Sequence, residues 1–314
     1  MRFRRAVCVF NPVSGEGTGR DMIGTVRQRL QRFVGEVDVA PTQSPNHAAE
    51  LARSAAREGC DLMVVQGGDG TVNEVAQGLA GHDSPAVLVL PGGTANVLVN
   101  EVGLPSDPVA ATDALPTLAV RKVSLGLVEF ESGESRFFVV MCGAGLDAEI
   151  AARTPTQLKN RLGLGAFWIR GSGQIMRPFP CLRIASIDAE SDVSGTTSLV
   201  VVSKSRVYGG GLVLTPGANL LAGRLEIAVF KGTGRLRFCG YLLAGVVAGT
   251  GWWPGVRHRT GTEVWIEPAS TEIVRVQVDG EVAGILPARV SVSPKTISVL
   301  MPPGYGRENL ESEV

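Results

Sequence analysis

The sequence is poor in charged and aromatic side chains, and it has no excess of charge of either sign. Charged residues make up 19% of the 314 residues, aromatic residues account for 5%, and the formal net charge is zero. A chain without net positive charge has no overall field that draws it to nucleic acid or to an anionic membrane. We therefore expect no nucleic-acid partner, and any membrane contact must be local.

Cysteine is scarce, and its spacing argues against a domain that is stabilised by disulfides or by zinc. The number of cysteines is odd, and none is spaced as Cys-x-x-Cys. This pattern disfavours a disulfide framework and a zinc site, and it favours reduced thiols buried in a cytoplasmic protein. The five are Cys8, Cys60, Cys142, Cys181 and Cys239.

Long apolar runs are also missing. The run at residues 6–10 stops at Asn11-Pro12, too early for a signal peptide. The longest apolar stretch, residues 238–251, is shorter than a bilayer span. Apolar residues still make up 44% of the chain, which is enough for one large core or two ordinary ones. We expect a soluble cytoplasmic protein.

The first third of the chain alternates strand and helix patterns. Such alternation predicts parallel strands joined by helical crossovers, with ligands at the carboxyl ends of the strands. Ser44-Pro45 predicts a capped helix start. The expected strands are residues 6–10, 37–40, 62–65 and 86–90, and the expected helices are residues 21–33, 44–58 and 71–79.

From about Val120 the pattern changes to short β-branched runs separated by Gly, Pro and Ser. This pattern predicts antiparallel sheets. The fold class is therefore an N-terminal doubly wound α/β domain followed by a β-sandwich-like domain. Strands are expected at residues 137–141, 182–187, 199–203, 225–230, 263–266, 273–278, 290–292 and 297–301, with helices at 147–152, 157–176 and 236–248.

Three glycines and a carboxylate lie between the third strand and its helix, in Gly67-Gly68-Asp69-Gly70-Thr71. Glycine lets the backbone turn sharply and approach a ligand closely. Amides at the helix N-terminus favour phosphate, while Asp69 indicates an accompanying Mg²⁺ or water-linked cation. The alternative is a tight turn with an exposed aspartate.

Polar residues also follow the other expected strands: Asn11, Thr42, Thr94 and Asn96. The carboxyl ends of four strands are therefore expected to meet at one binding site. The chain contains no Gly-x-x-x-x-Gly-Lys-Ser/Thr sequence, which excludes a P-loop mechanism. The glycines at residues 15–19 do not have dinucleotide-binding spacing, which disfavours a Rossmann dehydrogenase.

Six motifs in order resemble those of the diacylglycerol kinase-like lipid kinases, whose relatives include sphingosine kinases and, more distantly, NAD kinases. Together they span most of the chain. They are Asn11-Pro12-Val13-Ser14-Gly15, the nine residues from Gly67 to Val75, Pro91-Gly92-Gly93-Thr94-Ala95-Asn96, Gly145-Leu146-Asp147-Ala148, Tyr208-Gly209-Gly210-Gly211 and Asp279-Gly280-Glu281.

The resemblance implies an ATP- and Mg²⁺-dependent kinase of phospholipid metabolism that reaches its lipid at a membrane surface. It implies a nucleotide-binding domain at residues 1–124, to which 297–314 return, and a lipid-substrate domain at 125–296. A homodimer is left open. The nucleotide-binding residues implied are Asn11, Thr42, Gly67, Gly68, Asp69, Gly70, Thr71, Val72, Asn73, Thr94 and Asn96.

Glu281 is the better candidate for the general base, because the resemblance places the family's proposed base there. A base that accepts the proton of the acceptor hydroxyl is needed for phosphoryl transfer to an alcohol. Asp69 is the alternative base, although metal and water positioning is preferred for it. Asp279-Gly280 is also a common hairpin dipeptide, so a plain turn is the structural alternative.

Two positions depart from the family pattern. Lys204 stands where the family usually has Asn, and Ala222 replaces an Asp that helps to hold a structural Mg²⁺ in bacterial members. We therefore predict no Mg²⁺ on the carbonyls of Asn219 and Arg224, and no metal held by protein side chains. Asp188, Glu190 or Asp192 could substitute for the missing carboxylate.

The sequence thus predicts a kinase that phosphorylates the hydroxyl of a diacylglycerol-like lipid. A sphingoid-base kinase or an NAD kinase is the first alternative. A non-catalytic relative that binds lipid or nucleotide is the second, because of Lys204 and Ala222.

Overall fold

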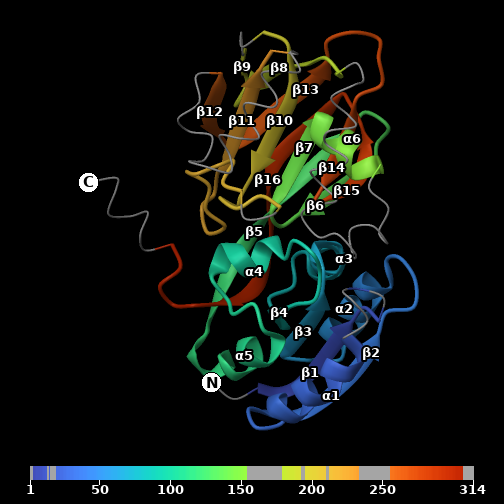
Figure 1. Ribbon diagram of the computed structural model, residues 1–314, viewed down its shortest axis with the longest axis vertical. Helices are drawn as coiled ribbons and strands as arrows, with labels where there is room; N and C mark the ends of the chain where they lie inside the picture. Colours follow the sequence, from blue (N-terminus) through green and yellow to red (C-terminus); the bar gives the residue numbers. More distant parts are fainter. Residues whose placement is uncertain are drawn as a thin grey trace. The chain divides into compact units, whose positions relative to one another are not determined.

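The computed structural model describes residues 3–12, 14, 19–153, 179–191, 195–209, 212–232 and 255–306 (Figure 1). The chain divides into two compact units, Met1–Leu125 with Pro294–Val314, and Gly126–Ser293. Two strands, β5 (Ala119–Phe130) and β16 (Ala288–Met301), each continue from one unit into the other. The first unit is α/β and the second is rich in strands, which confirms the predicted fold class.

The first unit is built on a parallel sheet in the order β2-β1-β3-β4, with the last part of β16 beside β4. Its strands are β1 (Phe3–Phe10), β2 (Val34–Pro41), β3 (Leu62–Gly67) and β4 (Ala86–Pro91). Because β1 pairs with β2 on one side and with β3 on the other, the winding direction reverses at β1. Ligands of doubly wound folds bind beside such a reversal, at the carboxyl ends of the strands.

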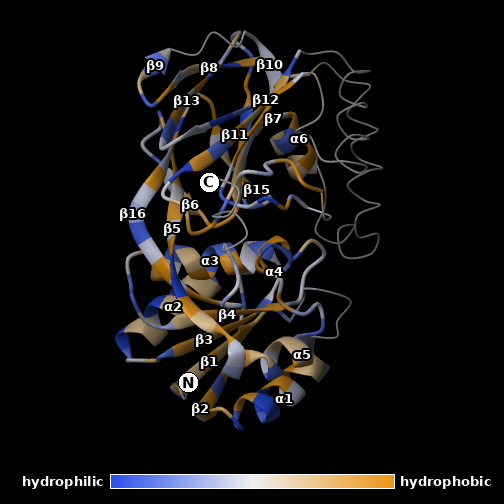
Figure 2. Ribbon diagram, turned by 90° about the vertical axis from the view of Figure 1, so that its left-hand side faces the viewer, coloured by the Kyte–Doolittle hydropathy of each residue, from blue (hydrophilic) through white to orange (hydrophobic). Residues whose placement is uncertain are grey.

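Helices cover both faces of this sheet (Figure 2). One face carries α1 (Gly19–Leu30) and α5 (Pro108–Asp113), which pack together, and the other carries α2 (His47–Arg57) and α3 (Asp69–Leu79). A short helix, α4 (Val97–Val102), follows β4. Every residue of β3 and β4 is buried, as expected for parallel strands covered on both sides.

The start of α2 corrects the sequence prediction. The helix begins at His47 and not at Ser44-Pro45, because Asn46 adopts the left-handed conformation with φ of 65°. Ser44 and Pro45 instead form a turn, in which the His47 amide donates to the Ser44 carbonyl at 3.2 Å. Asparagine tolerates this backbone conformation better than most residues.

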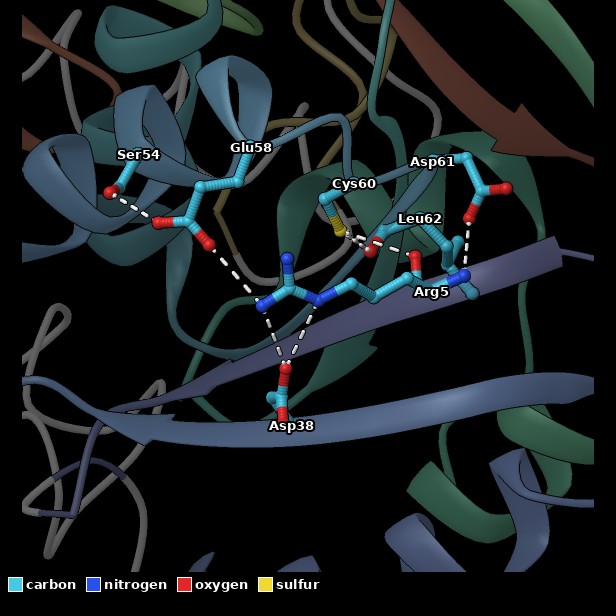
Figure 3. Close-up of polar contacts among 7 residues, drawn as sticks. All are labelled: Arg5, Asp38, Ser54, Glu58, Cys60, Asp61 and Leu62. Atoms are coloured by element: carbon cyan, nitrogen blue, oxygen red, sulfur yellow. Dashed lines mark hydrogen bonds and ion pairs between the residues drawn. The ribbon is translucent and has the colours of Figure 1, made fainter.

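The amino ends of β1 and β2 are joined by a group of ion pairs around Arg5 (Figure 3). The Arg5 guanidinium lies 3.1 Å from Asp38 and 3.2 Å from Glu58, at the end of α2. The Arg5 amide donates to Asp61 at 2.9 Å. Hydrogen bonding to Asp38 raises the pKa of Arg5, so this cation is fully charged and already neutralised by carboxylates.

The second unit is an antiparallel assembly that pairs β15-β14-β7-β10 and β8-β13-β16, with β11 between β10 and β12. One helix, α6 (Leu146–Arg153), follows β7. Its core is mostly aliphatic but includes Phe130 and Phe138, and Phe138, Leu182 and Ile227 are fully buried. The strands are β6 (Ser135–Phe138), β7 (Met141–Gly145), β8 (Leu182–Ile187), β9 (Glu190–Ser191), β10 (Thr197–Ser203), β11 (Leu225–Lys231), β12 (Val256–Gly261), β13 (Glu263–Pro268), β14 (Arg275–Val278) and β15 (Glu281–Ile285).

Three strand predictions in the second half of the chain were wrong in their bounds. The expected strand at 137–141 is split between β6 and β7, because the amides of Val139 and Val140 donate to a carboxylate and not to a neighbouring strand. The expected strands at 290–292 and 297–301 are one continuous strand, β16. The helices expected at 157–176 and 236–248 lie outside the described residues. Within the described part of the chain, no helix is long and apolar enough to cross a membrane.

Candidate active site

The glycine loop connects β3 to α3 without a capping side chain. β3 ends at Gly67, and Gly68 is the extended N-cap residue of α3, with φ of −82° and ψ of 179°. The first amides of a helix point outward, and a glycine cap leaves space in front of them. This arrangement suits the oxygen atoms of a phosphate group.

The loops after β3 and β4 pack backbone to backbone, which only glycine allows. A Cβ atom added to Gly92 would lie 2.8 Å from the Gly67 nitrogen, and one added to Gly93 would overlap the Cα atom of Gly68. A Cβ atom on Gly67 would lie 2.7 Å from the Thr71 hydroxyl. Gly92 and Gly93 are therefore required by the contact between the two loops, and Gly67 by its contact with Thr71.

Asp69 connects the same two loops. Its Oδ1 accepts a hydrogen bond from the Val97 amide at 2.7 Å, at the N-terminus of α4. Asp69 is half-buried, so it is not the simple exposed turn residue of the alternative interpretation. An ionised carboxylate has about four lone-pair positions, so the bond from the Val97 amide occupies one of them.

Asn96 holds the loop after β4 in shape. Its Oδ1 accepts from the amides of Gly92 and Gly93 at 3.2 and 2.8 Å, and its Nδ2 donates to the Gly93 carbonyl at 2.8 Å. Asn96 itself is left-handed, with φ of 46°. Thr94, in the middle of this loop, is exposed.

Asn11 and Thr42 lie at the carboxyl ends of the neighbouring strands. The Asn11 amide donates to the Gln66 carbonyl at 3.2 Å, and the Thr42 amide donates to the Phe10 carbonyl at 2.9 Å. The structure thus brings Asn11, Thr42 and the two glycine-rich loops to one edge of the sheet of the first unit, at the reversal of winding.

Three of the residues expected at the nucleotide have buried side chains. Asn73 is 1% exposed and its Oδ1 accepts from Gln77 at 3.2 Å. Val72 and Thr71 are buried as well. All three belong to the start of α3, where their buried side chains contribute to the packing of the helix that follows the loop. Gly68, Asp69 and Gly70 are partly exposed and carry the accessible part of the motif.

In the second unit, Asp279-Gly280 is the turn of a hairpin between β14 and β15. Both residues have positive φ, 46° and 89°, and Val278 pairs with Glu281. The Asp279 carboxylate is buried and accepts from the amides of Val139, Val140 and Met141 at 2.9 to 3.0 Å. Asp279 therefore anchors the hairpin to the segment between β6 and β7.

Glu281 is the first residue of β15 and reaches solvent. Its side chain is 48% exposed, and Oε2 accepts from the Arg136 guanidinium at 2.9 Å. The carboxylate thus has an open approach, which a group that exchanges protons with a substrate requires.

A network of hydrogen bonds between buried polar side chains stabilises this hairpin. The Gly280 amide donates to Gln277 Oε1 at 2.6 Å, and Gln277 Nε2 donates to Asp147 Oδ2 at 2.6 Å. The Tyr208 hydroxyl donates to Asp147 Oδ1, and burial raises the pKa of Tyr208 well above its ordinary value. This hydrogen-bond network gives a structural role to Asp147 and Tyr208, which belong to two of the six motifs. Gln277 was missed, although a glutamine between Val276 and Val278 in an apolar strand is a visible signal.

Replacing Asp279 by alanine should lower the free energy of unfolding by about 3 kcal/mol, because three buried amides lose their acceptor. Asp279→Asn is the matched control, since asparagine keeps one oxygen acceptor and tolerates positive φ. Urea unfolding of the full chain measures both. An alanine variant as stable as the asparagine variant would show that these bonds do not stabilise the hairpin.

Other parts of the described chain offer weaker candidates. No group of three or more His, Cys, Asp or Glu side chains gathers to hold a metal among the described residues. A shallow depression is lined by Phe3, Arg5, Gly35 and Glu58, among others. It lies at the amino ends of β1 and β2, at the opposite edge of the sheet from Asn11 and Gly67.

The comparisons with known proteins agree with this arrangement. A model of the diacylglycerol kinase catalytic domain matches residues 5–128, and a model of the YegS C-terminal NAD kinase beta sandwich-like domain matches residues 141–301. Diacylglycerol kinase of Bacillus subtilis is 28% identical over 305 residues, which cover 95% of this chain and 97% of that protein.

Two solved structures have a similar fold. A diacylglycerol kinase from Bacillus anthracis superposes with a TM-score of 0.75 at 23% identity, covering 97% of this chain and 99% of the other. Yeast NADH kinase complexed with NADH superposes with a TM-score of 0.50 at 11% identity, covering 95% of this chain and 84% of the other. The two matching domains and the six motifs lead to one conclusion: the chain belongs to the diacylglycerol kinase-like lipid kinase family.

Proposed function

We propose that this protein is an ATP- and Mg²⁺-dependent lipid kinase that transfers the γ-phosphoryl group to the hydroxyl of a diacylglycerol-like lipid. The observation that supports it most is the close backbone packing of Gly67 and Gly68 against Gly92 and Gly93, in front of the N-terminus of α3. Such a surface approaches phosphate oxygens with amides and not with side chains.

The roles of the residues follow from the chemistry of phosphoryl transfer. Glu281 accepts the proton of the lipid hydroxyl, and the resulting oxygen forms the new bond to the γ-phosphorus. The bond between that phosphorus and the bridging oxygen breaks, and ADP leaves. Asp69 would hold Mg²⁺, which would supply neutralisation of the charge on the phosphates. The glycine amides position the phosphates.

The acceptor is a lipid at a membrane surface, and the protein works from the cytoplasm. The alternative acceptors are a sphingoid base and NAD. Incubation with radiolabelled ATP and, separately, diacylglycerol vesicles, sphingosine vesicles or NAD distinguishes them. We expect label in diacylglycerol alone. Label in NAD would replace the proposal by an NAD kinase, and ATP binding without transfer to any acceptor would support a non-catalytic relative.

Replacing Asp69 by asparagine should lower kcat by about a hundredfold or more without lowering the stability of the protein. Asparagine can keep the oxygen that accepts from the Val97 amide, but it loses the charge that orients a cation. The melting temperature and the dependence of rate on Mg²⁺ concentration should be measured together. Turnover equal to that of the unmodified protein would remove Asp69 from the mechanism.

A further inference from the structure

A buried lysine lies at the loop that departs from the family pattern. Lys204 directly follows β10, its backbone amide donates to the Val140 carbonyl at 2.9 Å, and the residue is fully buried. Its ammonium donates to the Ala222 carbonyl at 2.9 Å. Burial lowers the pKa of Lys204 to about 8, so the ammonium form still dominates at neutral pH.

The Ala222 carbonyl belongs to a tight turn that leads into β11. The Ala222 amide donates to the Asn219 carbonyl at 3.0 Å, and the Leu221 amide donates to the Asn219 side chain at 2.9 Å. Leu220 is fully buried beneath this turn. The turn therefore presents carbonyl oxygen to the interior of the unit, where an oxygen acceptor needs a donor or a cation.

The residues at this turn do not fit a structural Mg²⁺. Magnesium requires octahedral oxygen ligands and usually at least one carboxylate, and Ala222 supplies a methyl group instead. The ammonium of Lys204 already contacts the Ala222 carbonyl, so a divalent ion there would be repelled.

Of the carboxylates that could have compensated, the two that the structure describes are placed elsewhere. Asp188 Oδ1 is engaged by the Thr262 amide and hydroxyl and by the Glu263 amide, at 2.8 to 2.9 Å. Glu190 is exposed in β9. Asp192 lies outside the described residues.

We propose that the Lys204 ammonium is a cation carried by the chain itself, which takes the place of a structural divalent ion at the turn of residues 219–224. Lys204 and Ala222 then act as one coupled pair of replacements. A carboxylate at 222 with a neutral residue at 204 would require a metal, while an ammonium at 204 removes that requirement. The inference concerns the stability of the second unit and does not depend on phosphoryl transfer.

Hydrogen exchange of the amides of residues 219–225 tests this proposal in the full-length protein without nucleotide. In the unmodified protein, the exchange rates of these amides should be the same in ~5 mM MgCl₂ as in ~5 mM EDTA. This Mg²⁺ concentration is high enough to occupy an ordinary Mg²⁺ site. Lys204→Met should speed their exchange by about tenfold, the change expected for the loss of one charge-assisted hydrogen bond. Lys122→Met, which removes an exposed ammonium from β5, should leave these amides unchanged.

A second variant keeps the proposal testable if Lys204→Met does not fold. The double variant Lys204→Asn, Ala222→Asp restores the pair typical of the family, and Mg²⁺ should slow exchange at residues 219–225 by about tenfold or more. Protection of these amides by Mg²⁺ in the unmodified protein would overturn the proposal. The proposal would also be overturned if Mg²⁺ did not change the amide exchange rates of the double variant, or if Lys204→Met left the exchange rates unchanged.

Discussion

Replacing Glu281 by glutamine is expected to lower kcat by about 10²–10⁴-fold, the usual contribution of a general base, while ATP affinity stays the same. Glutamine keeps the size of the side chain, but its amide cannot accept the proton of the acceptor hydroxyl. The side chain is 48% exposed, so the substitution should not disturb the packing of β15. Single-turnover rates and calorimetric ATP binding measure the two quantities separately.

The matched control is Glu272→Gln, which makes the same chemical change at an exposed glutamate ahead of β14. It should leave both quantities unchanged. Two results would contradict the assignment of Glu281. An unchanged kcat would show that another group accepts the proton. A collapse of ATP affinity would show that Glu281 is a nucleotide ligand or a structural residue.

Gly93→Ala should lower kcat/KM for ATP by about a hundredfold, the effect of displacing a binding loop by roughly an ångström. The new Cβ would overlap the Cα atom of Gly68, and neither loop has a flexible side chain there that could yield. The backbones of the two loops must therefore move apart.

Gly24→Ala is the matched control, because an added Cβ at this position in α1 meets no atom within 4 Å. Alanine within a helix should stabilise the protein slightly and leave ATP kinetics unchanged. If Gly93→Ala keeps the ATP kinetics of the unmodified protein, the packing of the two loops does not position the nucleotide.

The architecture was predictable because the spacing of apolar residues in each helix or strand reflects which of its faces are buried. The fully buried runs of β3 and β4 and the amphipathic helices between them are local patterns, and the elements appear close to their expected bounds. One of the errors came from an interaction between distant residues. The break between β6 and β7 depends on Asp279, about 140 residues further along the chain, and no local pattern contains it.

The candidate site was predictable where glycine and turn residues mark the chain, and not where one polar side chain supports another. The glycine loop and the Asp279-Gly280 hairpin are visible in the sequence. The bonds from Gln277 to Gly280 and to Asp147 are not, because they join separate elements. The contact of Lys204 with the Ala222 carbonyl likewise depends on the pairing of distant segments, although both residues stood out as departures.

The central claim is tested most directly by the products that the purified protein forms from ATP, Mg²⁺ and diacylglycerol in mixed vesicles. The account predicts one phosphorylated lipid for each ADP released, with label from the γ-phosphate on the former hydroxyl, and very little of either product with Glu281→Gln. ADP release without phosphorylated lipid, or phosphorylation of NAD in place of lipid, would contradict it.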